Sequence, residues 1–145
     1  MNDKNICCSY CGDTFTEWDH LRPLVINKKP TGYITEIHNL VPSCGKCNQS
    51  KGNKSWHTWM VSDAQLSPKT RQILDITERM SYLARYEDWH KPTQMDFEKI
   101  VGHEVWNVHW DNCDKIQQLM KESQLLAAKI KHEVEISYKA LEVNV

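Results

Sequence analysis

Four cysteines of this chain have the type and spacing of metal ligands. Two Cys-x-x-Cys pairs, Cys8/Cys11 and Cys44/Cys47, are separated by 32 residues. Four thiolates in two close pairs are the tetrahedral ligand set that a structural zinc ion prefers. The sequence therefore predicts one structural zinc site, Zn bound by four cysteines, that joins two distant points of the chain.

Two of the six cysteines lie outside these pairs. Cys7 competes with Cys8 as the first ligand, and we favour Cys8 because it leaves two residues before Cys11, as a tight knuckle requires. Cys113 is predicted to be a buried free thiol. Disulfides are the alternative, but the first thirty residues contain no apolar run of signal-peptide length. This absence favours a metal site in an intracellular, cytoplasmic protein.

An acid, a histidine and two amides lie between the cysteine pairs or directly after them: Asp19, His20, Asn39 and Asn48. Hydrolysis of a phosphodiester needs a nucleophile made from water, a Lewis acid and stabilisation of the departing oxygen. Mg²⁺ or Mn²⁺ prefers oxygen ligands, which the Asp19 carboxylate and the Asn48 amide could supply. His20, with an ordinary pKa of about 6.5, could accept the proton of the attacking water near pH 7.

Four segments within residues 7–54, "CSYC", "DHLRPL", "HNLVPSCGKCN" and "SKGNK", together resemble the HNH, or ββα-metal, endonuclease family, in its subgroup with a four-cysteine zinc site. The nine-residue step from Asn39 to Asn48 is often seen between the last two signature positions of that family. The resemblance implies that Asp19 and Asn48 hold a catalytic Mg or Mn ion. It implies that His20 activates water and that Asn39 braces the loop carrying it. It also implies cleavage of double-stranded DNA to 5′-phosphate and 3′-hydroxyl ends.

The net charge of −1 conceals an uneven distribution of charge along the chain. Residues 20–54 carry six lysines or arginines against one acid, whereas residues 55–145 carry eleven against fourteen acids. Because basic side chains bind the DNA backbone, we predict that the basic residues of the first segment contact nucleic acid. These residues are Arg22, Lys28, Lys29, Lys46, Lys51 and Lys54. For Lys51 and its neighbours, a solvated helix face is the alternative.

A small hairpin and a short helix must position these residues. The segment "FTEWDHLRPLVI" has strand-like content broken by a proline, and "YITEIHNLVP" is a second strand-like run. A helix is predicted to begin around Gly45–Cys47. Adjacent strand residues face opposite sides, so the first strand must bend or end where Asp19 and His20 reach one phosphate. His38 is a rival ligand, but we expect it to face outward from the second strand.

The sequence from residue 56 onward has helical periodicity. Ser67-Pro68 is a typical helix start, and Thr93 with Asp96 resembles a capping box. A long amphipathic helix is predicted from about residue 111 to residue 141. Tryptophan pairs at helical spacing are predicted to pack between helices rather than to stack on bases. These pairs are Trp56 with Trp59 and Trp106 with Trp110.

Together these elements predict an α+β fold, in which a small zinc-clipped ββα-metal module precedes a mostly helical C-terminal extension. We place the nuclease module at residues 1–55 and the extension at residues 56–145, where the sequence pattern changes. The apolar stripe of the last helix could bind the other helices, a partner protein or a second copy. A homodimer would place two sites on opposite strands of a DNA duplex. No apolar stretch is long enough to span a membrane.

The favoured function is a divalent-metal-dependent HNH endonuclease that hydrolyses DNA phosphodiester bonds, of the restriction or anti-phage defence type. The alternative is a non-catalytic zinc module that binds nucleic acid or a protein partner. The enzyme is favoured because a binding module has no use for the complete set of acid, histidine and two amides. The sequence carries no motif that distinguishes nicking from double-strand cutting or that indicates DNA specificity.

Overall fold

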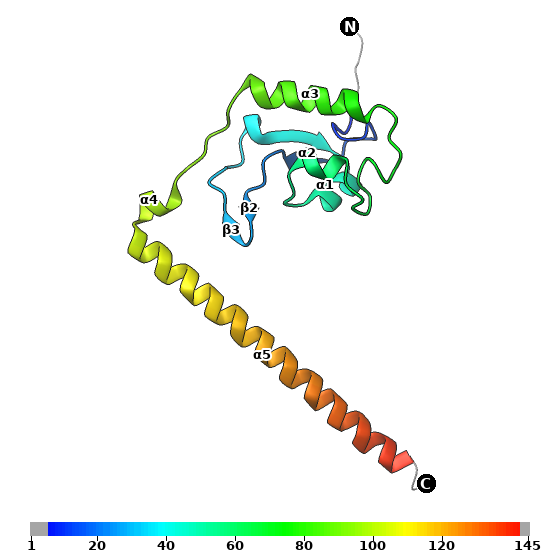
Figure 1. The fold of residues 1–145 in the computed structure, drawn as a ribbon, viewed down its shortest axis with the longest axis vertical. Coiled ribbons are helices and arrows are strands. Elements are labelled where there is room, and N and C mark those ends of the chain that lie inside the picture. The colour runs from blue at the N-terminus through cyan, green and yellow to red at the C-terminus, as the bar shows by residue number, and fades with distance from the viewer. Residues whose placement is uncertain (1–5, 143–145) are drawn as a thin grey trace. The chain divides into compact units, whose positions relative to one another are not determined.

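The chain forms two compact units in this computed structural model, Met1–Asp96 and Phe97–Val145, and the structure describes residues 6–142. The first unit contains the short strands, the helices α1 to α3 and both cysteine pairs, and the second contains α4 and α5 (Figure 1). The predicted α+β class, with a clustered four-cysteine site and a helical C-terminal part, is confirmed.

A two-stranded antiparallel sheet carries the acid and the histidine of the candidate site. Strand β1 (Glu17–His20) pairs with β4 (Leu40–Ser43), and Asp19 lies opposite Val41. Side chains alternate along β1, because Trp18 is 49% exposed whereas Asp19 is only 5% exposed. The face of β1 that carries Asp19 therefore points into the protein.

A second, smaller hairpin interrupts the connection between β1 and β4. Strand β2 (Val25–Ile26) pairs with β3 (Lys29–Pro30). The turn residues Asn27 and Lys28 have φ values of 49° and 68°, as two-residue hairpin turns require. The predicted first strand run is thus divided into β1 and β2, on either side of the proline that was expected to break it.

The second predicted strand run is only partly a strand. Its middle forms a 3₁₀ helix at Ile37–Asn39, and β4 begins after it. His38 lies in this 3₁₀ helix, is half-buried, and has its ring centroid 3.8 Å from that of His90. The prediction that His38 faces outward from a strand is therefore wrong, because the local backbone is helical.

Helix α1 (Gly45–Lys51) begins where the sequence predicted a helix. Cys44 occupies the N-cap position with an extended backbone, and the helix ends at Gly52, whose φ is 51°. Positive φ is disfavoured for residues with a Cβ atom, so glycine suits this helix end. The helix packs against β1, which completes the ββα arrangement.

Two further helices contribute to the core of the first unit. Helix α2 (Trp56–Met60) buries Trp56 and Trp59, as predicted, and α3 (Ile76–Trp89) buries Leu83. The predicted helix start at Ser67-Pro68 is wrong. The Ser67 hydroxyl instead donates to the backbone oxygen of Ser62, within a series of turns that precedes α3.

The first unit extends well beyond the predicted module boundary at residue 55. Trp56, Trp59 and Leu83 share one hydrophobic core with the cysteines, so α2 and α3 pack within the same unit. The chain then returns to the hairpin region, where the Met95 amide donates to the Gly32 oxygen. A Cβ atom on residue 32 would lie only 2.2 Å from the backbone oxygen of Met95, which explains why this position is a glycine.

Helix α4 (Phe97–Val101) follows the predicted capping box, but Thr93 does not cap it. The Thr93 backbone amide and hydroxyl both donate to the carboxylate of Glu36. Thr93, which the sequence suggested as a helix cap, therefore connects the segment before α4 to the loop after the small hairpin.

In the second unit, α5 (His103–Glu142) begins earlier than predicted. Trp106 stacks on Phe97 of α4 and packs edge-on against Trp110, so the two tryptophans contact each other and Trp106 also contacts α4. Cys113 is half-buried rather than buried, with its Sγ 3.7 Å from the His109 Nε2 atom.

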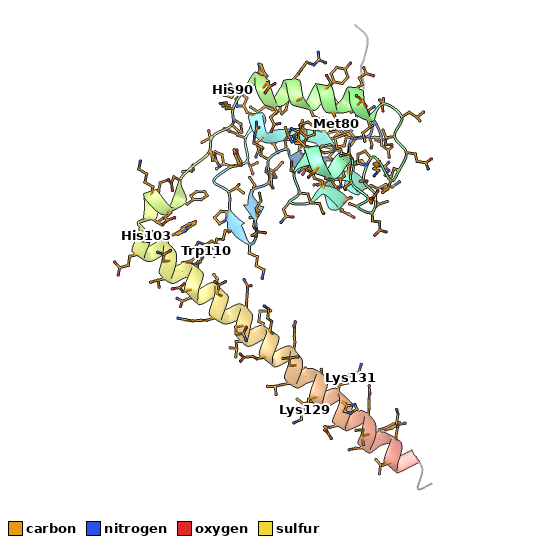
Figure 2. The ribbon with its side chains drawn as sticks, viewed as in Figure 1. Met80, His90, His103, Trp110, Lys129 and Lys131 are labelled. Atoms are coloured by element: carbon orange, nitrogen blue, oxygen red, sulfur yellow. The ribbon has the colours of Figure 1, made fainter. Side chains whose placement is uncertain are left out.

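The greater part of α5 exposes its apolar stripe. Figure 2 shows side chains projecting around this helix, including the labelled Lys129 and Lys131, and residues such as Ile130 and Val134 are more than half exposed. Within the described part of the chain, none of the helices has the length and apolar composition to cross a membrane.

Candidate metal centre and active site

Cys8, Cys11, Cys44 and Cys47 converge in the first unit, with all four sulfur atoms within 4.8 Å of one another. The sulfurs of Cys11 and Cys44 are 3.7 Å apart. This distance matches the edge of a zinc–sulfur tetrahedron, about 3.8 Å for 2.3 Å bonds. The cysteines are therefore positioned to bind a metal ion such as zinc. Cys7 is exposed and lies outside the cluster, as the choice of Cys8 predicted.

The cluster connects the first knuckle to the start of α1. Gly12, with a φ of 77°, donates its amide to the Cys8 oxygen and closes the first turn. In the second pair, Cys44 caps α1 and Cys47 lies in its first turn. A metal bound here would fix the helix to the N-terminal knuckle, and its binding energy would contribute to folding.

Hydrogen bonding within the cluster favours a thiolate. Hydrogen bonds with Cys11 and Cys47 lower the pKa of the Cys8 thiol to about 3, whereas hydrogen bonds with Cys11 and Cys8 raise the pKa of Cys47. The guanidinium of Arg71 lies 3.4 Å from the Cys47 sulfur and 3.5 Å from the Asp13 carboxylate. A cation at this position offsets part of the negative charge of four thiolates.

The first knuckle also holds Asp19 directly. Tyr10, between Cys8 and Cys11, donates its hydroxyl to Asp19 Oδ2 at 2.5 Å and packs its ring edge-on against Trp59. Burial and the Asp19 charge raise the pKa of Tyr10, so its hydroxyl remains a donor. The first cysteine knuckle therefore positions Asp19 through one hydrogen bond.

Lys51 is the buried counter-ion of Asp19. Its side chain is completely buried, and its Nζ atom lies 3.0 Å from Asp19 Oδ2 and donates to the His20 backbone oxygen at 2.7 Å. Burial lowers the pKa of Lys51, and the Asp19 charge opposes this. Neither a surface DNA contact nor a solvated helix face, the two predictions for Lys51, describes this environment. Lys51 lies four positions after Cys47, about one helical turn, so both point inward from α1.

His20 ends β1, and the chain bends at the next two residues, as the requirement for a shared site predicted. Its Nε2 atom lies 2.8 Å from the Thr35 hydroxyl. Burial lowers the pKa of His20 below its ordinary value; the Asp19 charge raises it and the Lys51 charge lowers it. When Nε2 carries the proton and donates to Thr35, Nδ1 keeps a lone pair that can accept a proton.

Asn39 ties together the loops around His20. Its Oδ1 atom accepts from the Arg22 amide at 2.8 Å, and its Nδ2 atom donates to the Arg22 and Ile34 oxygens at 3.0 and 3.3 Å. The backbone amide of Leu21, next to His20, donates to the backbone oxygen of Asn39. Asn39 itself is fully buried. Through these contacts Asn39 connects the backbone that follows His20 to the loop at Ile34.

Asn48 faces β1 from α1. Its Nδ2 atom donates to Glu17 Oε2 at 2.5 Å. Glu17 and Asp19 are two residues apart on β1 and share one face, while Asn48 and Lys51 are one helical turn apart on α1. Two cross-element pairs, Glu17 with Asn48 and Asp19 with Lys51, therefore lie next to each other.

The oxygen donors of this group fit a hard divalent cation. Asp19 belongs to one of the two cross-element pairs and Asn48 belongs to the other. Tyr10 and Lys51 both contact the Oδ2 atom of Asp19. Carboxylate and amide oxygens suit Mg²⁺ or Mn²⁺ rather than softer metals. Within residues 6–142, the cysteine cluster is the only group of three or more metal-ligating side chains of the His, Cys, Asp and Glu types. A cation between Asp19 and Asn48 would therefore need water or substrate oxygens to complete its coordination.

The predicted nucleic-acid contacts occupy different environments. Arg22 is turned inward, with its Nη2 atom 3.3 Å from the Glu87 carboxylate and 3.2 Å from the Glu87 backbone oxygen. Lys54 is exposed and donates to the Ser50 oxygen at 2.9 Å. The other exposed basic residues of this region are Lys28, Lys29 and Lys46.

Sequence reasoning missed several residues that position the site. Glu17 could have been found, because it precedes Asp19 by two residues and so shares its strand face. The inward direction of Lys51 was available from its spacing to Cys47. Thr35 and Arg71 lie in segments without periodicity, so only tertiary structure reveals them.

The HNH endonuclease family model matches residues 8–54, from the first clustered cysteine to the turn after α1. Residues 8–54 form an HNH endonuclease domain. The resemblance seen in the sequence is thereby confirmed, and the HNH domain includes Asp19, His20, Asn39 and Asn48.

The chain is also similar to the CRISPR-associated endonuclease Cas9 of Corynebacterium diphtheriae. The two are 38% identical over 78 residues, which are 51% of this chain and 7% of the Cas9 protein. The chain therefore spans a small fraction of its relative's length. No solved structure matches the chain. The HNH domain and this relative support a nuclease-type, metal-dependent function.

Proposed function

We propose that this protein is a divalent-metal-dependent endonuclease that hydrolyses phosphodiester bonds of double-stranded DNA. The observation that supports this most strongly is the cross-element group at the centre of the HNH domain. Lys51 of α1 contacts both the Asp19 carboxylate and the His20 backbone, and Asn48 lies one turn earlier on the same helix. These contacts support a shared site for the family's acid, histidine and amide.

His20 is the general base in the proposed mechanism. Its Nδ1 atom accepts the proton of the attacking water, a contribution typically worth about 10²–10⁴-fold in rate. Because burial lowers its pKa, the imidazole is neutral and able to accept a proton at pH 7. Asn39 holds the backbone on the C-terminal side of His20, and Thr35 fixes the ring.

Asp19 and Asn48 would hold the catalytic Mg²⁺ or Mn²⁺ through one carboxylate oxygen and one amide oxygen. The ion, when bound, supplies Lewis-acid stabilisation of the charge that develops on the phosphate and the leaving oxygen. Asp19 is held ready by Tyr10, and Asn48 is carried by the helix that the zinc cluster anchors.

A non-catalytic zinc module that binds nucleic acid or a protein is the second candidate. It is favoured by one observation: Asp19 Oδ2 is already engaged by Tyr10 and Lys51. If this pairing is the only role of Asp19, the acid is structural.

Cleavage of a supercoiled plasmid distinguishes the two candidates. The zinc-loaded protein is incubated with Mg²⁺ or Mn²⁺ beside His20→Ala and Asp19→Ala, each first shown to be folded. We expect metal-dependent cutting by the natural protein and loss of cutting in both variants. Equal cutting by all three would reveal a contaminating nuclease, and no cutting by any would favour the binding module.

DNA contacts are proposed for the exposed lysines near the site. Lys46 and Lys54 lie on or after α1, and Lys28 and Lys29 lie in the small hairpin. Phosphate contacts of this type are independent of DNA sequence and weaken as salt concentration rises. The similarity to Cas9 agrees with a role in defence against foreign DNA, which includes restriction, and we propose that role for this protein.

We also propose that α5 forms a homodimer. Met120, Ala127, Val134 and Leu141 recur every seven residues, and Ile130 precedes Val134 by four residues. This is the spacing of a coiled-coil seam, and the seam is exposed along the helix. Two copies would supply the two active sites that a double-strand cutter requires.

A further inference from the structure

We propose that Glu17 is a positioning residue that fixes the orientation of the Asn48 side chain, so that the amide oxygen rather than the nitrogen is presented to the cation. This inference rests on the proposed function, because it assigns a role beside the same metal site. It begins from the hydrogen bond between the Asn48 Nδ2 atom and the Glu17 Oε2 atom.

The chemistry of the two groups determines which end of the amide faces Glu17. A carboxylate only accepts hydrogen bonds, whereas an asparagine amide has a nitrogen that donates and an oxygen that accepts. The Asn48 nitrogen must therefore face Glu17. The amide oxygen, on the opposite side of the planar group, is left available as a ligand for a hard cation.

Glu17 is itself held against α1. A Cβ atom on Gly45 would lie 3.0 Å from Glu17 Oε1, so the first turn of the helix closely approaches this carboxylate. The neighbouring Thr16 hydroxyl accepts from the Gly45 amide at 3.1 Å. One carboxylate oxygen of Glu17 thus abuts the start of α1 while the other accepts from Asn48.

The arrangement also changes the expected effect of replacing Asn48. Oxygen ligation alone predicts that Asn48→Asp keeps activity, since aspartate also offers an oxygen. In this structure, however, an aspartate would bring a second carboxylate against Glu17, so that two groups that only accept hydrogen bonds would face each other with no donor between them. We therefore expect Asn48→Asp to be impaired, and the double variant Glu17→Gln/Asn48→Asp to be restored. In the double variant, the glutamine nitrogen donates to the aspartate.

The test measures Mn²⁺ affinity by electron paramagnetic resonance of the zinc-loaded full chain. Glu17→Ala leaves the amide free to turn over, and we expect the Kd for Mn²⁺ to rise about 10- to 100-fold. Glu17→Gln keeps an acceptor oxygen, so its Kd should remain within a few-fold of the natural value. Glu78→Gln removes an exposed acid on α3 and serves as the control for net charge.

Three results would overturn the inference. If Glu17→Gln bound Mn²⁺ as weakly as Glu17→Ala does, Glu17 would act through its charge. Natural affinity in a folded Glu17→Ala would mean that it has no role at the site. A double variant no better than Asn48→Asp would remove the orientation argument. Failure of the proposed function is separable, because the natural protein would then neither bind Mn²⁺ nor cut DNA.

A measurement without Mn²⁺ tests the orientation of the Asn48 side-chain amide directly. The Asn48 side-chain NH₂ resonances in ¹⁵N-resolved NMR spectra should shift in Glu17→Ala relative to the natural protein, because their acceptor is lost. Unchanged Asn48 resonances would contradict the hydrogen bond on which the inference depends.

Discussion

At the scale of single residues, His20 lies in an environment that suits a base. Burial lowers its pKa, and the two charges next to it, Asp19 and Lys51, have opposite effects. The neutral imidazole is the form that accepts a proton, so proposed activity is lost as pH falls through the pKa of His20. A cation bound nearby would lower this pKa further.

The pH dependence of cleavage follows from this environment. We expect kcat/KM to rise with pH and to level off, with the midpoint of the acid limb below pH 6.5, the ordinary pKa of histidine being about 6.5. The measurement is a pH profile at saturating Mg²⁺. A midpoint above pH 6.5 would contradict the burial effect.

The ion pair between Asp19 and Lys51 should contribute measurably to the free energy of unfolding. Lys51→Met leaves a buried carboxylate without its counter-ion, and we expect the free energy of unfolding to fall by about 3–5 kcal/mol. Adding Asp19→Asn removes the stranded charge while keeping an acceptor for Tyr10, so the double variant should be more stable than Lys51→Met alone. Urea denaturation of the zinc-loaded proteins measures both.

Lys54→Met is the matched control, because Lys54 is exposed. Its replacement should change the free energy of unfolding by less than about 1 kcal/mol. If the double variant were no more stable than Lys51→Met, the loss would come from packing of the lysine stem rather than from the unpaired charge.

At the scale of elements, the four-cysteine cluster determines where α1 lies. Cys44 and Cys47 hold the start of the helix, Tyr10 of the first knuckle holds Asp19, and the helix presents Asn48. The structural metal would therefore position both proposed ligands of the proposed catalytic ion. Under the proposed function, this coupling is the reason that Asn48 directly follows Cys47.

Removal of zinc should unfold the first unit. We expect Cys47→Ser, or a chelator, to abolish zinc binding and to shift the fluorescence of the buried Trp59 toward that of exposed tryptophan, because zinc binding in such modules is folding energy. Cys7→Ser is the control and should bind zinc normally, since Cys7 lies outside the cluster. Full zinc content in a folded Cys47→Ser would show that the cluster is not the metal site.

The elements differ in how well the sequence predicted them. Helix α1 and the Cys8 choice came from local spacing, which the fold preserves. The start of α3 was misplaced, because Ser67 is a good cap residue that instead bonds within a turn. The capping signal at Thr93 was likewise used for a tertiary contact with Glu36. Local signals fail where a side chain has a better partner elsewhere in the fold.

At the scale of the whole molecule, the compact unit around the site is larger than the HNH match. The family model ends at residue 54, whereas the first unit continues to residue 96. The change of sequence pattern at residue 56 coincides with the start of α2, which lies inside the first compact unit. Trp59 is buried in the same core as the cysteines, and the periodicity of the sequence does not predict this tertiary packing.

The exposed seam of α5 predicts the oligomeric state. We expect a mass near twice the 17.0 kDa of one chain in sedimentation analysis at micromolar concentration. Replacing both Met120 and Val134 by glutamate should give monomers, whereas Lys129→Gln, outside the seam, should not. A monomeric natural protein would remove the dimer proposal and leave the seam to another partner.

The central claim is that His20 activates water in a metal-dependent nuclease, and single-turnover cleavage of a labelled duplex tests it most directly. We predict that His20→Ala slows cleavage at least about 100-fold in Mg²⁺ and that added imidazole restores part of the rate, because it replaces the missing base. A folded, zinc-loaded His20→Ala that cuts at the natural rate, with or without imidazole, would contradict the account.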